Sequence, residues 1–225
     1  MNFYECVKAY PEGSSSASRM ALTARNLGYK GIIICNCDPT RIFMLPAAER
    51  VTGIEIAVGA EVVASNVRAL KSRIGTLRTR YPFLVVHGVT DEIVRIASED
   101  PNVDLLVYPC ESRRPLSIAT AKAAKLNQVS IGFDLSPLIH LRGSQRSRWL
   151  AAVSRNLQLV RKFELSSIIT AGAKSHLDLR SPHDLAALAE VAGFGPEEAE
   201  EAMSRQGMLL AQNRRHWVGP GVELL

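Results

Sequence analysis

Cysteine is scarce in this 225-residue chain, and the spacing of the four that are present excludes the common zinc motifs. Cys6, Cys35, Cys37 and Cys110 are separated by 28, 1 and 72 residues, whereas structural zinc sites use Cys-x-x-Cys pairs. Each cysteine lies in or just after a predicted strand, where a small apolar side chain packs well. We therefore expect four buried free thiols rather than metal ligands.

Long hydrophobic runs are missing as well. The longest ones, such as residues 31–35 and 83–86, are far shorter than the roughly 20 residues that cross a bilayer. The first residues, MNFYECVKAY, lack the basic and apolar regions of a secretory signal. The sequence therefore predicts a cytoplasmic protein with no membrane contact.

Several catalytic and nucleotide-binding motifs are also absent. No Gly-x-Gly-x-x-Gly turn follows the first predicted strand, and there is no Walker loop and no Gly-x-Ser-x-Gly elbow. Neither a His-x-His nor a His-Glu-x-x-His pair occurs. These absences argue against a dinucleotide-binding enzyme, a P-loop enzyme, an α/β-hydrolase and a histidine-rich metal centre.

What the chain does contain is a regular alternation of short apolar runs and longer amphipathic segments. The apolar runs are continuous rather than alternating, which is typical of strands covered on both faces in a parallel sheet. Seven such strands are predicted, over residues 3–7, 31–36, 53–58, 83–87, 104–108, 129–135 and 167–171. Helices are predicted over residues 15–27, 65–81, 91–98, 115–127, 144–163 and 181–192.

This alternation favours an α/β fold of one domain. A TIM-barrel-like (β/α) barrel is preferred to an open doubly wound sheet, because the number of units approaches eight and the Gly-rich turn is missing. We predict a barrel domain over residues 1–218 and an irregular tail over residues 219–225. A mostly polar helix over residues 197–215 is expected to pack peripherally on this domain.

The formal charge of +5 is modest, but the charges are unevenly distributed. Residues 62–90 and residues 136–163 contain basic side chains and no acidic ones, whereas residues 197–201 contain four acids. The first basic segment carries Arg68, Lys71, Arg73, Arg78 and Arg80. The second carries Arg142, Arg146, Arg148, Arg155, Arg161 and Lys162.

Both basic segments coincide with a predicted amphipathic helix. Surface helices usually mix acidic and basic residues, because pairs four residues apart stabilise the helix. The cations of an acid-free helix repel one another unless a polyanion neutralises them, and nucleic acid is the usual candidate for that polyanion. The alternative is a solvated helix face whose charges have acidic neighbours from other segments. Trp149 and Tyr81 fall on or near the buried faces, so phosphate contact is favoured over base stacking.

Five further basic residues in predicted loops are secondary candidates for contact with RNA or a partner protein: Lys8, Arg113, Arg114, Lys174 and Arg180.

The predicted strands place three candidate metal ligands in or at the end of strands. Glu55, His87 and Asp134 combine carboxylate and imidazole groups that suit a divalent metal. A hydrolytic metal site normally draws on more ligands, so we expect no catalytic residue and no metal or cofactor bound by this chain. In the alternative interpretation, Glu55 pairs with a cation in the barrel mouth and His87 is a strand-end histidine with satisfied hydrogen bonds.

Several segments, in this order, resemble the ribonuclease P protein component 3 family, whose eukaryotic counterpart is the thirty-kilodalton subunit. They are Ala24-Arg25-Asn26-Leu27-Gly28-Tyr29, Phe83-Leu84-Val85-Val86-His87-Gly88 and Asp104-Leu105-Leu106-Val107-Tyr108-Pro109. The most distinctive match is residues 167–173 followed by Leu179-Arg180-Ser181-Pro182-His183-Asp184-Leu185. The first strand, Tyr4-Glu5-Cys6-Val7, departs from the family habit of an Asp followed by apolar residues.

The resemblance implies a barrel similar to that of the polymerase and histidinol phosphatase superfamily, without its full metal site. It also implies a non-catalytic subunit of the ribonucleoprotein that removes 5′ leaders from precursor tRNA, in which the RNA hydrolyses the phosphodiester with magnesium. The partners implied are the ribonuclease P RNA and a small protein, in a two-plus-two heterotetramer.

Two other functions stay open at this point. One is a metal-dependent phosphoesterase of the same superfamily that uses Glu55, His87 and Asp134. The other is a small-molecule barrel enzyme with a phosphate site at Ala171-Gly172-Ala173. The missing histidine pair argues against the first, and the second leaves the acid-free helices unexplained.

Overall fold

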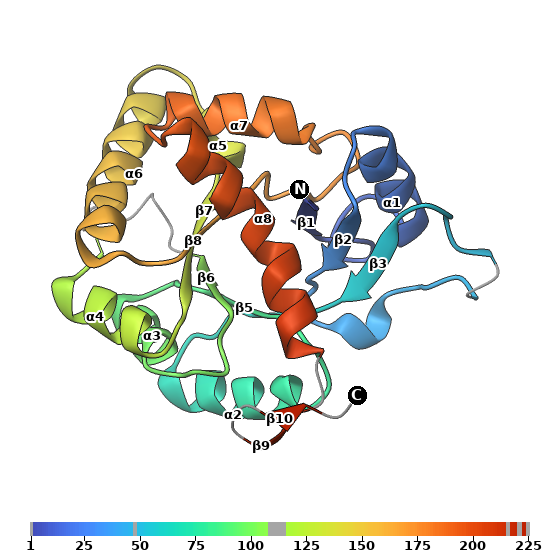
Figure 1. Ribbon diagram of the computed structural model, residues 1–225, viewed down its shortest axis with the longest axis horizontal. Coiled ribbons are helices and arrows are strands. Elements are labelled where there is room, and N and C mark those ends of the chain that lie inside the picture. Colours follow the sequence, from blue (N-terminus) through green and yellow to red (C-terminus); the bar gives the residue numbers. More distant parts are fainter. Residues whose placement is uncertain (1, 47–48, 108–115, 215–216, 220–221, 224–225) are drawn as a thin grey trace.

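The computed structural model describes residues 2–46, 49–107, 116–214, 217–219 and 222–223. The strands occupy the middle of the molecule with helices arranged around them, and one long helix crosses the centre of the view (Figure 1). The strands are β1 (Tyr4–Val7), β2 (Gly31–Ile34), β3 (Glu55–Val58), β4 (Ala60–Val62), β5 (Leu84–His87), β6 (Leu105–Val107), β7 (Ser130–Asp134), β8 (Ser167–Thr170), β9 (Trp217–Gly219) and β10 (Val222–Glu223). The helices are α1 (Ala17–Asn26), α2 (Val67–Arg78), α3 (Asp91–Ser98), α4 (Ile118–Leu126), α5 (Ser136–His140), α6 (Gly143–Phe163), α7 (Pro182–Val191) and α8 (Pro196–Asn213), with a 3-10 turn at Pro39–Arg41.

The seven predicted strands are present, and the pairs formed among β1 to β8 are all parallel. The hydrogen-bonded order is β1-β2-β3 in one sheet and β4-β5-β6-β7-β8 in the other. Ile32, Ile33 and Ile34 of β2 are fully buried, as expected of a strand covered on both faces. The predicted α/β architecture is therefore confirmed.

A strand that the sequence did not predict, β4, follows β3 after the single residue Gly59. Residues 55–58 pair with β2, and after Gly59 residues 60–62 pair with β5. The two sheets are thus joined into one curved arrangement. A Cβ atom at position 59 would lie 2.7 Å from the carbonyl oxygen of Phe83, so glycine is what permits this close backbone approach.

We expect Gly59→Ala to destabilise the fold by about 1–3 kcal/mol, the usual cost of forcing extra volume into a packed region. Denaturant unfolding would measure this as a lower midpoint with an unchanged slope. Gly75→Ala is the matched control, since nothing lies within 4 Å of a Cβ atom at that helical position. A Gly59→Ala protein as stable as the native one would contradict the proposed contact.

The seam between β8 and β1 is where the barrel would close. Among the described residues it contains one isolated bridge, between Val7 and Ala173, rather than a continuous ladder. Side chains complete the contact: Glu5 accepts hydrogen bonds from the Ala171 N–H (2.8 Å) and the Thr170 hydroxyl (2.6 Å). Gln206 of α8 donates to the carbonyl oxygen of Ile169 (2.9 Å). Polar groups at the edge of β8 are therefore satisfied by side chains.

Helix α8 is not the peripheral element that its polar sequence predicts. It lies against β1 and β8, and its Leu210 belongs to the same buried cluster as Ile33, Phe83 and Leu105. Near its end, Asn213 donates to the carbonyl oxygen of Pro82 (2.8 Å). Pro82 precedes β5, so α8 covers the amino-terminal end of the barrel. The prediction failed because a narrow apolar stripe on a polar helix does not reveal how deeply that stripe is buried.

Helix starts are the local features that the sequence predicts best. Ser181 caps α7 by accepting from the Asp184 N–H (3.1 Å), with Pro182 in the first turn, as expected. Helix α5 was not predicted, and the tail expected to be irregular contains β10, which pairs antiparallel with β9. Within the described part of the chain, no helix has both the length and the apolar character needed to span a membrane.

Candidate functional site

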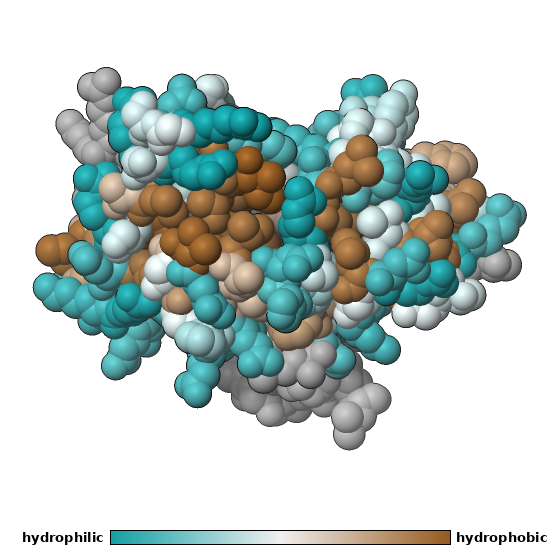
Figure 2. Space-filling view, turned by 90° about the horizontal axis from the view of Figure 1, so that it is seen from above, coloured by the Kyte–Doolittle hydropathy of each residue, from teal (hydrophilic) through white to brown (hydrophobic). Residues whose placement is uncertain are grey.

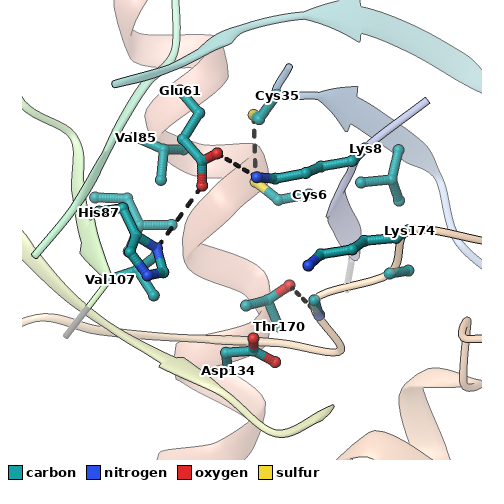
Figure 3. A pocket seen from close by; sticks show the side chains of 14 residues that line it. Cys6, Lys8, Cys35, Glu61, Val85, His87, Val107, Asp134, Thr170 and Lys174 are labelled. Atoms are coloured by element: carbon teal, nitrogen blue, oxygen red, sulfur yellow. Dashed lines mark hydrogen bonds and ion pairs between the residues drawn. The ribbon is translucent and has the colours of Figure 1, made fainter. Parts of the chain in front are cut away.

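A pocket opens at the carboxyl end of the strands, where β/α barrels place their functional groups (Figure 3). Its charged and polar side chains come from five different strand ends: Lys8 after β1, Glu61 in β4, His87 in β5, Asp134 in β7 and Lys174 after β8. We call this pocket the barrel mouth. Its floor includes Cys6 and Cys35, whose sulfur atoms are 3.9 Å apart.

Glu61 and Lys8 form an ion pair inside the barrel mouth. The Glu61 carboxylate also accepts from the Cys37 thiol (3.2 Å) and lies 3.9 Å from Nδ1 of His87. Burial opposes the charged form of Lys8, but the Glu61 carboxylate outweighs it and raises the pKa of the lysine. Burial and the same carboxylate raise the pKa of Cys37 to about 12. Lys8 therefore stays charged and Cys37 stays a thiol at neutral pH.

The three predicted metal ligands do not meet in the structure. His87 and Asp134 both line the barrel mouth, but Glu55 lies at the opposite end of the strands. There it pairs with Arg214 and accepts from the Tyr4 hydroxyl (2.5 Å). These hydrogen bonds outweigh the effect of burial and lower the pKa of Glu55. The alternative that Glu55 pairs with a cation is confirmed, although not in the barrel mouth.

The groups present in the mouth do not fit the divalent metal that the resemblance to a phosphatase superfamily would imply. No cluster of three or more His, Cys, Asp or Glu side chains suited to a metal occurs among the described residues. Instead, the ammonium group of Lys8 faces Glu61. A fixed cation beside the most buried carboxylate of the mouth repels a second cation there.

Asp134 is held in place from two sides. Its Oδ1 atom accepts from the Ser136 N–H (2.8 Å). Gly172 has a left-handed backbone (φ 58°), and a Cβ atom there would lie 2.4 Å from the Asp134 carboxylate. The Thr170 hydroxyl in turn accepts from the Gly172 N–H (3.1 Å). The strand ends of β7 and β8 thus fix the orientation of this carboxylate.

The first basic segment, on α2, is less exposed to partners than the acid-free sequence suggests. Arg78 forms an ion pair with Asp104 (2.6 Å) and is largely buried there. Arg73 donates to the carbonyl oxygens of Cys37 (2.7 Å) and Val63 (3.3 Å). The prediction that the basic side chains of this helix have no acidic partner is therefore wrong for Arg78. Arg68, Lys71 and Arg80 are exposed and have no acidic partner within the described part of the chain.

The second basic segment, on α6, keeps an unpaired row. Arg146 donates to the carbonyl oxygen of Leu141 (2.7 Å), and Arg161 pairs with Glu198 (2.7 Å). Arg148, Arg155 and Lys162 are exposed at seven-residue spacing, and none meets an acidic side chain in the described residues. Arg148 donates to the carbonyl oxygen of Ser144 (3.3 Å), and the Lys162 ammonium group lies 5.8 Å from the centre of the Phe163 ring. We call these three residues the α6 row. Arg142, at the start of α6, is also exposed.

The remaining candidate residues have different surroundings. Arg180 donates to the carbonyl oxygens of Leu177 (2.9 Å) and Leu179 (2.8 Å), so it stabilises its own loop. Lys174 projects into the barrel mouth (Figure 3). Arg113 and Arg114, and also Cys110, lie outside the described residues. Of the other cysteines Cys35 is buried while Cys6 and Cys37 are half-buried, and all three are free thiols.

An apolar area occupies one face of the molecule. Seen from above, hydrophobic side chains gather in the left part of the view and hydrophilic side chains border them (Figure 2). Helix α7 lies along the top of Figure 1 and therefore faces the viewer of Figure 2. Its Val191 is 65% exposed. Contiguous exposed apolar surface often marks a contact with another protein.

Sequence reasoning missed Glu61 and underestimated Lys8. Glu61 was overlooked because the strand was expected to end before Gly59, although the apolar residues Ala60, Val62 and Val63 around it signal a continuing strand. Glu5, which the sequence marks only as a departure from the family pattern, is 1% exposed at the seam.

Comparison with known proteins agrees with this architecture. Residues 1–217 match the family described as RNase P subunit p30. A ribonuclease P protein component 3 from Methanosarcina acetivorans is 40% identical over 99% of this chain and 95% of its own length. The one from Haloarcula marismortui is 31% identical, over 98% and 96%.

A chain in the cryo-EM structure of archaeal ribonuclease P with mature tRNA has a similar fold, with a TM-score of 0.82 over 99% of this chain and 97% of that one, at 20% identity. A putative histidinol phosphatase from Listeria monocytogenes shares the fold more distantly, with a TM-score of 0.55 at 8% identity over 80% of this chain and 97% of that one. The fold is thus TIM-barrel-like, as predicted. The chain belongs to the RNase P subunit p30 family.

Proposed function

We propose that this chain is a protein subunit of ribonuclease P, the endoribonuclease that removes 5′ leaders from precursor tRNA. Membership of the family supports this role. The observation that supports RNA binding is the α6 row, whose three cations have no acidic neighbour in the described residues. Such a row neutralises phosphates of a folded RNA and positions it by shape rather than by sequence.

In this proposal the chain carries no catalytic residue, and magnesium ions serve the catalytic RNA of the holoenzyme. The partners are the ribonuclease P RNA, precursor tRNA within the holoenzyme and a small protein subunit, in a two-plus-two heterotetramer in the cytoplasm. The apolar face that includes α7 suits the protein partner, whereas Arg68, Lys71 and Arg80 add to the RNA-binding surface.

Replacing the α6 row by glutamine should reduce the salt dependence of RNA binding. Each cation that leaves a phosphate stops releasing a counterion, so the slope of log K against log salt should flatten by about 2–3 units for three residues. Titration of the ribonuclease P RNA with the protein at several salt concentrations measures this slope.

The matched control removes three other cations, Arg19, Arg41 and Lys122, which are exposed and lie outside the two basic segments. It should change the slope by much less than the α6-row variant does. Equal slopes for the native protein and the α6-row variant would move that row from the RNA surface to solvent or to a protein interface.

The rival proposal is a metal-dependent phosphoesterase, and it makes a different prediction. Magnesium-dependent cleavage of precursor tRNA by the chain alone, lost in His87→Ala, would overturn the subunit role. We expect cleavage only when the RNA subunit and the partner proteins are added, and we expect His87→Ala to retain it.

A further inference from the structure

We propose that the barrel mouth binds a small protonated phosphate group between Lys8, His87, Lys174 and Asp134. The ribonuclease P role assigns no function to this pocket, since the α6 row lies on an outer helix. The four side chains come from different strand ends and surround one open space (Figure 3). Convergence of polar groups at the carboxyl ends of parallel strands is the usual setting of a ligand site in this fold.

The size of the cavity limits the ligand. Its volume is about 120 Å³. Sites for drug-sized molecules occupy about 300–1,000 Å³. A cavity of this size accommodates a tetrahedral oxyanion.

The two lysines and two carboxylates of the mouth balance in formal charge, so the N–H donors of the lysines, rather than an excess of positive charge, favour an oxyanion over a metal ion. Two lysines face the cavity, and Glu61 neutralises only Lys8, which keeps further N–H donors because an ammonium group has three. The ammonium group of Lys174 has no hydrogen-bond or ion-pair partner among the described residues. His87 is 41% exposed at its side chain and offers a ring nitrogen to the cavity. These groups supply donors for phosphate oxygens.

Asp134 determines which oxyanion is accepted. A carboxylate repels a fully ionised anion but accepts a hydrogen bond from a P–OH group. Inorganic phosphate keeps a proton at neutral pH, whereas sulfate does not. Since Ser136 and Gly172 fix the orientation of Asp134, the carboxylate stays aimed at the cavity. The mouth should therefore discriminate phosphate from sulfate.

Titration of the full-length chain with inorganic phosphate, without any RNA, tests this site. The imidazole NMR signals of His87 should shift saturably, and sodium sulfate at equal ionic strength should need at least tenfold higher concentration. Lys174→Met should weaken phosphate binding at least tenfold, because it removes an ammonium donor from the cavity. It should leave the fold intact, because the exposed side chain holds no structural contact. Lys122→Met, an exposed lysine on α4, is the matched control and should leave binding unchanged.

Two further ligands identify the source of the phosphate group. At about pH 6, where roughly half of the phosphomonoester groups keep a proton, an oligoribonucleotide with a 5′-phosphate is compared with the same oligonucleotide ending in a 5′-hydroxyl. Preference for the phosphorylated end supports capture of an RNA terminus, and binding of inorganic phosphate alone supports the free ion.

No saturable shift with either phosphate source, equal responses to phosphate and sulfate, or unchanged affinity in Lys174→Met would each overturn the proposal. None of these results bears on the ribonuclease P role, because no measurement uses the ribonuclease P RNA.

Discussion

Glu5→Gln should abolish a loss of folding stability that the native protein shows between about pH 5 and pH 8. Glu5 is 1% exposed, and burial raises its pKa to about 8, against the effect of its hydrogen bonds from Thr170 and Ala171. The nearby charge of Asp134 raises it further. The folded state therefore holds a proton that the unfolded state releases near pH 4.5.

The sign follows from this difference in proton binding. A group with a raised folded pKa contributes its stability below the unfolded pKa and loses it as the pH rises through the folded pKa. One proton changes the free energy of unfolding by about 1.4 kcal/mol per pH unit, so the loss over this range is on the order of 4 kcal/mol. Glutamine resembles the protonated acid and does not titrate.

Urea unfolding at several pH values between 5 and 9 measures the effect. The difference between the native protein and Glu5→Gln isolates Glu5 from the other titrating groups, and Glu190→Gln on the exposed face of α7 is the control. Parallel pH profiles for native protein and Glu5→Gln would show that Glu5 is ionised when folded.

Asp104→Ala is the second change with a large expected effect. The Asp104 carboxylate accepts from Arg78 at the end of α2 (2.6 Å), from the Leu84 N–H of β5 (2.7 Å) and from Asn213 of α8 (2.7 Å). It therefore links three elements at the amino-terminal end of the barrel. Its loss leaves a largely buried guanidinium and two other donors unpaired, at a cost of about 3–5 kcal/mol.

The ion pair between Arg78 and Asp104 stabilises the fold by less than the loss of about 3–5 kcal/mol expected for Asp104→Ala. Burial raises the pKa of Asp104 even though Arg78 and the other donors lower it, so the charge is not fully compensated. We therefore expect the double variant Arg78→Met with Asp104→Leu to regain the part of the loss that comes from the unpaired guanidinium. Guanidinium unfolding of the single and double variants measures the coupling.

Glu200→Ala, an exposed position on α8, serves as the control and should change stability by less than about 0.5 kcal/mol. If the double variant were as unstable as Asp104→Ala, the unpaired Leu84 N–H and Asn213 amide, rather than the unpaired guanidinium, would be the cause.

The seven strands and most helices could be predicted because their signals are local. A strand buried on both faces must be apolar throughout, and a helix start needs a side chain that accepts from its free N–H groups. Helix α3 matches its predicted bounds, residues 91–98. The missed continuation of β3 into β4 depended on a contact between Gly59 and Phe83, which are 24 positions apart in the chain.

The candidate sites were predictable only in part. The exposed α6 row follows from helical periodicity, since residues seven apart lie on one helix face. The partners of Arg78 and Arg161 lie 26 and 37 positions away, so their ion pairs could not be read from acid-free segments. For the same reason, the sequence-based prediction grouped Glu55 with His87 and Asp134 as metal ligands, although Glu55 lies at the other end of the barrel.

By itself, the sequence determined the parallel β/α architecture, the family resemblance and the presence of unusually basic helices. Only the tertiary structure decided which charges are free, that α8 closes one end of the barrel, and that Lys8 and Glu61 meet in its mouth. The reason is physical: local patterns record whether a side chain is buried, whereas its partner depends on strand register and on segments that meet only when the chain folds.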